Sequence, residues 1–500
     1  MLASIRYFLR FIDLESKFDK HGFTKKLGAS FKLNDKREAF TNFVAVNGPN
    51  GYAWNVVRSE SDLLMFQHAS QSGARTFDGT KVESIEFEPT GDGEHLGQPV
   101  AAKWLRKDGS LGTIEFDYVV DASGRAGILS TKYMKNRKFN EGLKNVATWG
   151  YWKGAKTYAP GTEREGQPFF EALDDMSGWW WAIPLHNGSL SVGIVMRQDE
   201  SIKRKKAAGS PSTLESYKES LSLSPIISDL VSSAELASPI RAASDWSYSA
   251  SCYAGSHFRI VGDAGCFIDP FFSSGLHLAI AAGLSAAMTI QAARRGDCDE
   301  STAARWHSSK VTEGYTRFLL VVMMVLKQIR KGSEPVLSDF DQDGFDKAFG
   351  FFTPGLADAD VGGKLTQARV SDTVNFCLSA YNQITPEDRN AVLDKLARVR
   401  ADKSKETRED LEKLTEDELR ILRTIRARQI IRTEDTLNID HFSEDALDGY
   451  APRLKRGELG LARVEQRDGI PKYTESLLDV LKGAEDGEEV VVYRENGSGN

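Results

Sequence analysis

Two acidic residues in this sequence each follow a short apolar run and precede small residues, a pattern that could bind a nucleotide cofactor. Asp263 lies in the run Arg259–Gly265, and Asp121 comes directly after Tyr118–Val120. Open α/β sheets bind their ligands at the edge where the strands end. A carboxylate at this edge could accept hydrogen bonds from the hydroxyls of a ribose or a ribityl chain. An ordinary turn, or an incidental acidic residue at a helix start, is the alternative for each segment. The two segments together predict a nucleotide-cofactor fold.

Two further features could complete such a site. A helix is predicted over Ser273–Arg295. Its start offers free backbone N–H groups and a partial positive charge, which suit the negative charge of a reduced flavin. Arg58 precedes the helical segment Leu63–Ala69 and could pair with a cofactor phosphate or brace a flavin, although a surface arginine has the same spacing. These features indicate the flavin-monooxygenase type of cofactor fold.

The elements that must position these residues follow from hydrophobic periodicity. Apolar residues recur at helical spacing from Leu2 to Ile12, so an amphipathic helix is expected there. The dipeptide Asn187–Gly188 between two alternating runs predicts a β-hairpin. The apolar run Phe318–Leu326 predicts a buried core helix, because a membrane helix needs roughly 20 apolar residues. Strands are predicted over Val82–Glu88, Ala101–Arg106, Ile114–Val120, Gly178–Leu185, Leu190–Met196 and 259–263.

The composition is that of an ordinary globular chain. Of the 500 residues, 41% are hydrophobic and 27% are charged, which is enough for a sizeable core. The net charge of -7 gives no support to a nucleic-acid partner, and neither a signal peptide nor a membrane segment is predicted. The cysteines are widely spaced, so we expect no disulfide framework, no metal site and a reducing compartment, the cytoplasm. They are Cys252, Cys266, Cys298 and Cys377.

Three bulky residues alternate along one of the predicted strands. Trp179, Trp181 and Ile183 are two positions apart, so their side chains share one face of the strand, and Trp180 points to the other face. An aromatic core face is the simplest explanation of this pattern.

The sequence resembles the fungal flavin-dependent halogenases that act on phenolic polyketides, from residue 1 to about residue 465. The resemblance lies in the order and spacing of several segments. The resemblance implies an α/β fold (α+β overall), a flavin-monooxygenase-like FAD-binding fold with a second β-sheet substrate region and a helical C-terminal region. It also implies reduced FAD as cofactor, chloride as co-substrate and a separate flavin reductase as partner. The segments that carry it are Lys25–Gly28, Trp54–Glu60, Val120–Gly127, Asn145–Gly154, Gly178–Asn187 and Arg259–His277.

Two features distinguish halogenases from the related aromatic hydroxylases, and both are present. The first is the pattern W-x-W-x-I, whose wall in the family keeps the organic substrate away from the flavin. The second is a lysine that receives hypohalous acid, as a hydrogen-bonded species or as a chloramine. Lys26 matches it because it directly precedes Leu27–Gly28 as in the family, whereas the residues alone do not choose between Lys25 and Lys26. A positioned amine would keep the electrophile beside the target carbon.

The resemblance also assigns contacts around the predicted helix start. Ser274 and Gly275 would bind chloride, as a helix N-terminus suits an anion. The residues expected to contact the cofactor are Arg58, Asp121, Asp263, Gly265 and Leu276.

The substrate class follows from a difference within the family. Tryptophan halogenases carry a glutamate after Asp-Pro that is thought to stabilise a cationic ring intermediate, whereas Phe271 and Phe272 occupy that stretch here. A phenol can spread the developing charge onto its own oxygen. A phenolic or polyketide small molecule is therefore expected in place of tryptophan.

The sequence departs from the family at its beginning, because it contains no G-x-G-x-x-G fingerprint in a βαβ unit. We therefore expect a catalytic region over 1–330 that is incomplete at its N-terminus, a helical region over 331–482 and a disordered tail over 483–500. Two alternatives to a halogenase are a flavin-dependent aromatic hydroxylase, which would insert oxygen without chloride, and a non-catalytic truncated flavoprotein.

Overall fold

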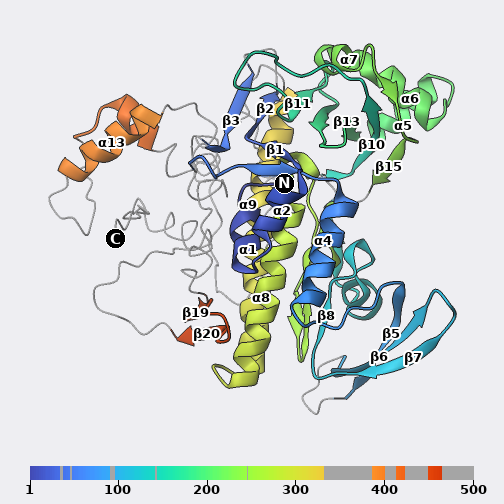
Figure 1. The fold of residues 1–500 in the computed structure, drawn as a ribbon, viewed down its shortest axis with the longest axis vertical. Coiled ribbons are helices and arrows are strands. Elements are labelled where there is room, and N and C mark those ends of the chain that lie inside the picture. The colour runs from blue at the N-terminus through green and yellow to red at the C-terminus, as the bar shows by residue number, and fades with distance from the viewer. Residues whose placement is uncertain are drawn as a thin grey trace, which may run out of the picture.

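The computed structural model describes most of the first two thirds of the chain and five shorter parts beyond it (Figure 1). The described residues are 1–331 without 34–37, 45–47, 90–95, 141–142 and 245, together with 386–399, 411, 413–422, 447 and 449–463.

One part of the described fold is built on a large mixed sheet. Its described strands follow the order β14-β10-β13-β12-β11-β2-β3, with β15 also paired to β10. All neighbours are antiparallel except β11 and β2, which are parallel. The strands are β2 (Gly28–Lys32), β3 (Ala39–Asn42), β10 (Asn145–Lys153), β11 (Phe169–Ala172), β12 (Gly178–Pro184), β13 (Ser189–Arg197), β14 (Glu235–Leu236) and β15 (Arg241–Ser244).

Helices cover the two faces of this sheet differently. Figure 1 shows α5 (Gln198–Ala207), α6 (Thr213–Ser220) and α7 (Pro225–Leu230) gathered beside β10 and β13. Tyr217 of α6 and Ile227 of α7 pack there with one apolar cluster. The other face belongs to the main core, which includes residues of α8 (Gly275–Arg295) and α9 (Glu300–Lys331). The predictions of a long helix after Ser273 and of a buried core helix at Phe318–Leu326 are confirmed.

A small sheet packs against the two long helices α8 and α9. Here β8 (Val119–Asp121) and β18 (Phe258–Ile260) are parallel neighbours, and β17 (Ala254–Gly255) pairs with β18. His307 of α9 connects this sheet to α8: its Nε2 donates to the Ile260 carbonyl at 3.0 Å, and its Nδ1 lies 2.9 Å from Ser285 Oγ. Burial lowers the pKa of His307 to about 3, so the ring is neutral and Nδ1 accepts from the hydroxyl.

The predicted strand Ile114–Val120 is wrong as a single element. Its first part belongs to β7 (Leu111–Glu115), which pairs with β6 (Gln98–Arg106) and through it with β5 (Thr80–Glu88). Its last part is β8, which pairs with β18 in another sheet. The chain leaves the first sheet near Phe116, because Val119 pairs in parallel with Phe258 of β18, which lies in another sheet. Apolar periodicity continues through such a crossover and does not reveal it.

The N-terminal segment packs as two short helices and a strand pair. Its cluster contains Ile5, Leu9 and Phe18, and the buried guanidinium of Arg6 lies 4.2 Å from the Tyr52 ring and 4.4 Å from the Trp54 ring. The elements are α1 (Ile5–Phe11), α2 (Glu15–His21), β1 (Thr24–Lys26), β4 (Ala53–Asn55) and α4 (Arg58–Gln71).

The predicted helical C-terminal region contains a β-hairpin, which the prediction missed. Strands β19 (Tyr450–Arg453) and β20 (Gly460–Arg463) are antiparallel, and Trp306 Nε1 donates to the Tyr450 carbonyl at 3.0 Å. Helix α13 (Pro386–Val399) agrees with the prediction, and residues 483–500 lie outside the described part. The other described elements are β9 (Arg137–Phe139), β16 (Tyr248–Ala250), η1 (Gly124–Ala126), η2 (Ile128–Tyr133), η4 (Leu221–Leu223), η5 (Gly262–Ala264) and η6 (Pro270–Phe272).

One described helix, α8, is long and apolar enough to cross a membrane, and a third of its apolar window is buried in the fold. It packs against α9, α1 and β20, and its residues Leu278, Ala282 and Ala286 belong to the main core. These contacts are those of a central helix in a packed domain.

A buried ion pair joins β18 to the start of α9 and gives a test of this packing. Arg259 is fully buried, its Nη1 lies 2.8 Å from Glu300 Oε1, and Tyr118 donates to the same carboxylate at 3.0 Å. We expect Glu300→Ala to lower the free energy of unfolding by about 3 kcal/mol, because it leaves a buried positive charge without its partner. Urea unfolding measures the change.

A matched control is the exposed pair Lys103–Glu86, which has the same 2.8 Å separation. Glu86→Ala should change the free energy of unfolding by less than about 1 kcal/mol, because water screens both charges. Equal effects of the two substitutions would contradict the role given to burial.

Candidate functional site

The two adjacent lysines of β1 lie in different surroundings. Strand β1 pairs with β4, and side chains alternate along it, so Lys26 faces the interior and Lys25 faces outward. Lys26 is only 4% exposed, and its Nζ lies 5.4 Å from the centroid of the Phe43 ring. The exposed Lys25 places its Nζ 4.5 Å from the Tyr52 ring centroid. Of the two amines, Lys26 is therefore the one held inside the protein.

A glutamine that the sequence did not single out fixes the bend after Lys26. Gln167 Oε1 accepts hydrogen bonds from the backbone N–H of Leu27 at 2.7 Å and of Gly28 at 3.3 Å. These bonds hold the point where the chain leaves β1 and enters β2. An isolated glutamine far along the chain gives no local signal for such a contact, so only the fold reveals it.

The tryptophans of β12 divide between the two cores as predicted. Trp179 belongs to the main core, and Trp181 and Ile183 pack against it, whereas Trp180 is buried in the cluster under α6 and α7. Trp179 is 1% exposed, and its ring centroid lies 5.7 Å from that of Trp181. The predicted shared face of Trp179, Trp181 and Ile183 is thus confirmed, and its role as a wall stays a prediction.

A glycine on the neighbouring strand makes room for Trp181. Gly193 of β13 is the register partner of Trp181, and a Cβ atom at this position would overlap the indole ring. Trp181 Nε1 donates to Ser191 Oγ at 3.2 Å, which orients the ring along β13. The sequence analysis missed Gly193, because the significance of a glycine within a strand depends on what its neighbour carries.

An aromatic stack connects this wall to the start of α8. The ring centroid of Phe271 lies 4.9 Å from that of Trp179, 5.6 Å from Phe31 and 5.7 Å from Phe170. The fully buried Asp269 accepts from the Phe271 N–H at 3.2 Å and so fixes the turn that carries this ring. The structure therefore brings the wall and the predicted chloride segment together.

The predicted chloride residues lie at the N-terminus of α8. Ser274 is 2% exposed and directly precedes the helix, and Gly275 and Leu276 are its first two residues. The first N–H groups of a helix have no acceptor within it, and the helix dipole adds positive charge there. A bound anion at this position would satisfy both requirements, so chloride binding here stays a prediction that the local geometry suits.

Asp263 has the environment expected of a cofactor-binding carboxylate. It is half-buried, and within the described part of the chain its side chain accepts no hydrogen bond. Burial raises the pKa of Asp263 above its ordinary value, while the charges of Arg58, Arg125 and Arg137 act in the opposite direction. The hydroxyls of a ribityl chain would supply the missing donors, so this residue fits a flavin.

Asp121 instead holds its own loop. This buried carboxylate accepts from the backbone N–H of Ser123 at 3.0 Å and of Leu129 at 2.7 Å. Because each oxygen already has a donor, a cofactor contact would have to share one of them. The structure places Asp121 beside Ile260 and near Asp263, and gives it a bracing role that the sequence did not predict.

The other two predicted cofactor residues are also placed. Arg58 begins α4 and is exposed, so a phosphate could reach its guanidinium. The guanidinium also pairs with Asp62 at 3.0 Å. Gly265 is buried, and a Cβ atom there would lie 2.6 Å from the Tyr253 ring. Close packing against Tyr253 is thus a reason for glycine at this position in addition to any contact with a cofactor.

The sequence matches the family described as tryptophan halogenase over residues 44–324. The chain is 57% identical to the sulochrin halogenase gedL of Aspergillus terreus, over 93% of this chain and 86% of that protein. It is 52% identical to the flavin-dependent halogenase ptaM of Pestalotiopsis fici, over 93% and 87% of the two chains.

Solved structures of similar fold include two halogenating enzymes. The flavin-dependent halogenase CmlS matches with a TM-score of 0.60 and 22% identity, over 80% of this chain and 70% of that chain. The flavin-dependent brominase Bmp2 matches with a TM-score of 0.58 and 21% identity, over 75% and 87%. These likenesses support the predicted flavin-monooxygenase-like fold.

The contact between Gly193 and Trp181 can be tested through stability. We expect Gly193→Ala to lower the free energy of unfolding by about 2 kcal/mol, because the new methyl group forces the indole out of its packed position. In a Trp181→Ala background the same change should cost less than half as much. Urea unfolding of the four chains of this double-mutant cycle measures the difference, and equal costs in both backgrounds would show that the indole is not responsible.

Proposed function

The chain belongs to the flavin-dependent halogenases, and on that premise we propose that it chlorinates the activated ring of a phenolic small molecule, with Lys26 holding the electrophile. The observation that carries this proposal is the buried amine of Lys26 beside an exposed Lys25. A confined amine keeps a reactive chlorine species at one place, whereas an exposed amine would release it to water.

When reduced FAD is bound, its reaction with oxygen supplies the oxidising power that converts chloride into an electrophile. The residues that would hold it are Asp263 through the ribityl hydroxyls, Arg58 through phosphate, and Gly265 and Leu276 by close approach of the backbone. Asp121 would act mainly by fixing the neighbouring loop. The N–H groups at Ser274 and Gly275 would place chloride at the start of α8.

The wall of Trp179, Trp181 and Ile183 would exclude the organic ring from the flavin. Its rigidity is supported by the contacts of Trp179 with Phe271 and of Trp181 with Ser191. An electrophile small enough to pass this wall would then reach Lys26, and the aromatic ring of the substrate would react with it there. Exclusion of the ring is what favours halogenation over direct oxygen insertion.

The phenolic substrate class rests on the residues after Asp269–Pro270. Phe271 is buried in the aromatic stack, so no carboxylate stands at that position to stabilise a cationic ring. A phenol can delocalise that charge onto its own oxygen. The similarity to a sulochrin halogenase supports a small aromatic substrate of this kind.

We also infer a partner and a location. As the resemblance to the flavin-dependent halogenases implies, a separate flavin reductase would supply the reduced FAD. The cysteines are widely spaced in the sequence, and on that basis we infer a reducing compartment such as the cytoplasm.

The test compares Lys26→Ala with the matched control Lys25→Ala. With reduced FAD, chloride and a phenol, we expect Lys26→Ala to lower the rate of chlorination by roughly a hundredfold or more, because the electrophile is no longer positioned. Lys25→Ala should stay within about twofold of the native rate, since its amine faces solvent. Mass spectrometry of the product measures the rate, and quenching of flavin fluorescence verifies that both variants bind FAD.

Native activity in Lys26→Ala would refute the assigned role. A hydroxylated product formed equally well without chloride would instead identify an aromatic hydroxylase and refute the halogenation proposal itself.

A further inference from the structure

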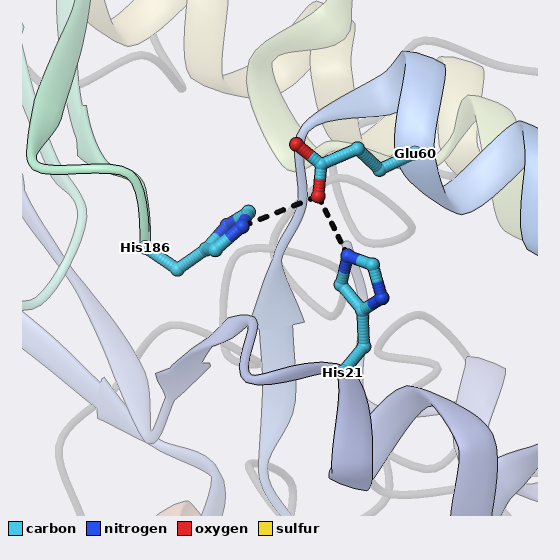
Figure 2. A group of neighbouring side chains, drawn as sticks. All are labelled: His21, Glu60 and His186. Atoms are coloured by element: carbon cyan, nitrogen blue, oxygen red, sulfur yellow. Dashed lines mark hydrogen bonds and ion pairs between the residues drawn. The ribbon is translucent and has the colours of Figure 1, made fainter.

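Three side chains from distant parts of the sequence meet beside β1, as Figure 2 shows. His21 ends α2, Glu60 lies in the first turn of α4, and His186 lies in the turn between β12 and β13. Glu60 Oε2 is 2.6 Å from His21 Nε2 and 3.2 Å from His186 Nε2. Both imidazoles therefore point at the same carboxylate oxygen.

The separations in this cluster suit a metal ion. One ligand atom from each of His21, Glu60 and His186 lies within 4.8 Å of the other two. Ligands about 2.0–2.1 Å from a tetrahedral zinc ion are separated by about 3.3 Å, so small side-chain rotations would bring all three into coordination. Two imidazole nitrogens and one carboxylate are a common protein ligand set for zinc and similar divalent ions.

The cluster is accessible as well as preformed. The side chains of His21, Glu60 and His186 are 28%, 36% and 21% exposed, so an ion could enter without opening the core. The ring of Phe23 lies 4.3 Å from that of His21 and 5.3 Å from that of His186, measured between centroids. This apolar ring packs against both imidazoles, which limits their movement and favours a defined geometry.

Each of the three residues adjoins an element of the halogenase site. His21 closely precedes Lys26, Glu60 shares its helical turn with Arg58, and His186 follows the strand that carries Ile183. An ion bound by all three would tie α2, α4 and the β12–β13 turn together. It would therefore fix the relative positions of the amine, the phosphate-facing arginine and the wall.

We propose that His21, Glu60 and His186 form a binding site for a divalent transition-metal ion, with Zn²⁺ as the preferred occupant, that fastens these three elements together. The ion acts on position and takes no part in electron transfer, because zinc has no redox chemistry. The sequence did not predict this metal site, because its cysteines are widely spaced and these three ligands have no local spacing pattern. This proposal is independent of the role of Lys26, because its test measures metal binding.

The experiment uses the full chain freed of metal with a chelator, and Co²⁺ and Zn²⁺ as probes. Calorimetric titration should give about one Zn²⁺ per chain, and Co²⁺ should develop the visible absorption of a site with nitrogen and oxygen ligands. Glu60→Gln and His186→Ala should each weaken binding tenfold or more, because each removes one of three protein ligands. At the same concentration, Zn²⁺ should raise the melting temperature of the native chain by clearly more than that of Glu60→Gln.

The matched control is His68→Ala, since His68 lies on the same helix as Glu60 but contacts the Ile12 carbonyl. This variant should bind Zn²⁺ as the native chain does. Far-UV circular dichroism and the melting temperature without metal show whether each variant is folded, and Glu60→Gln preserves the size of the side chain and one acceptor oxygen. The proposal is overturned by absence of saturable binding to the native chain, or by equal affinity in the native chain and folded Glu60→Gln. Either result would leave the cluster as two histidines sharing a hydrogen-bonded carboxylate.

Discussion

Alternation of side chains along β12 is the constraint on which the organisation of this enzyme depends. The strand lies in the middle of a sheet that has an apolar cluster against each face, so consecutive tryptophans pack in opposite cores. Trp180 fills the cluster beneath α6 and α7, while Trp179 and Trp181 face the side of α8. A shift of one residue in register would exchange these faces and place the wall in the wrong core.

The same constraint extends to the other parts of the site through aromatic contacts. Phe170 and Phe31 stack across the parallel strands β11 and β2, with ring centroids 5.1 Å apart. Phe271 lies against both of them and against Trp179, so the start of α8 is held at a fixed distance from the wall. Strand β1, which carries Lys26, directly precedes β2 in the chain. Rigid packing thus positions groups that never contact each other directly.

The sequence predicted elements with strong local signals and missed features that arise from long-range contacts. The β12–β13 hairpin, α8 and the buried part of α9 follow from alternation, a turn dipeptide and apolar content, and all three are confirmed. The break between β7 and β8 and the hairpin β19–β20 depend on partners far along the chain. Gln167 and Gly193 act through neighbours that only the register defines. No spacing within the sequence could have predicted these pairings.

The two acidic strand ends show how context separates residues that look equivalent in the sequence. Both follow an apolar run and both precede small residues, so the sequence predicted the same role for each. Asp121 lies where the loop folds back over it, and two backbone N–H groups occupy its oxygens. Asp263 keeps a half-buried carboxylate among three arginine charges without a hydrogen bond from the described residues. Because a buried carboxylate without donors is unfavourable, Asp263 has more to gain than Asp121 from the hydroxyls that a bound flavin would offer. The division of labour follows from which carboxylate the fold has already satisfied.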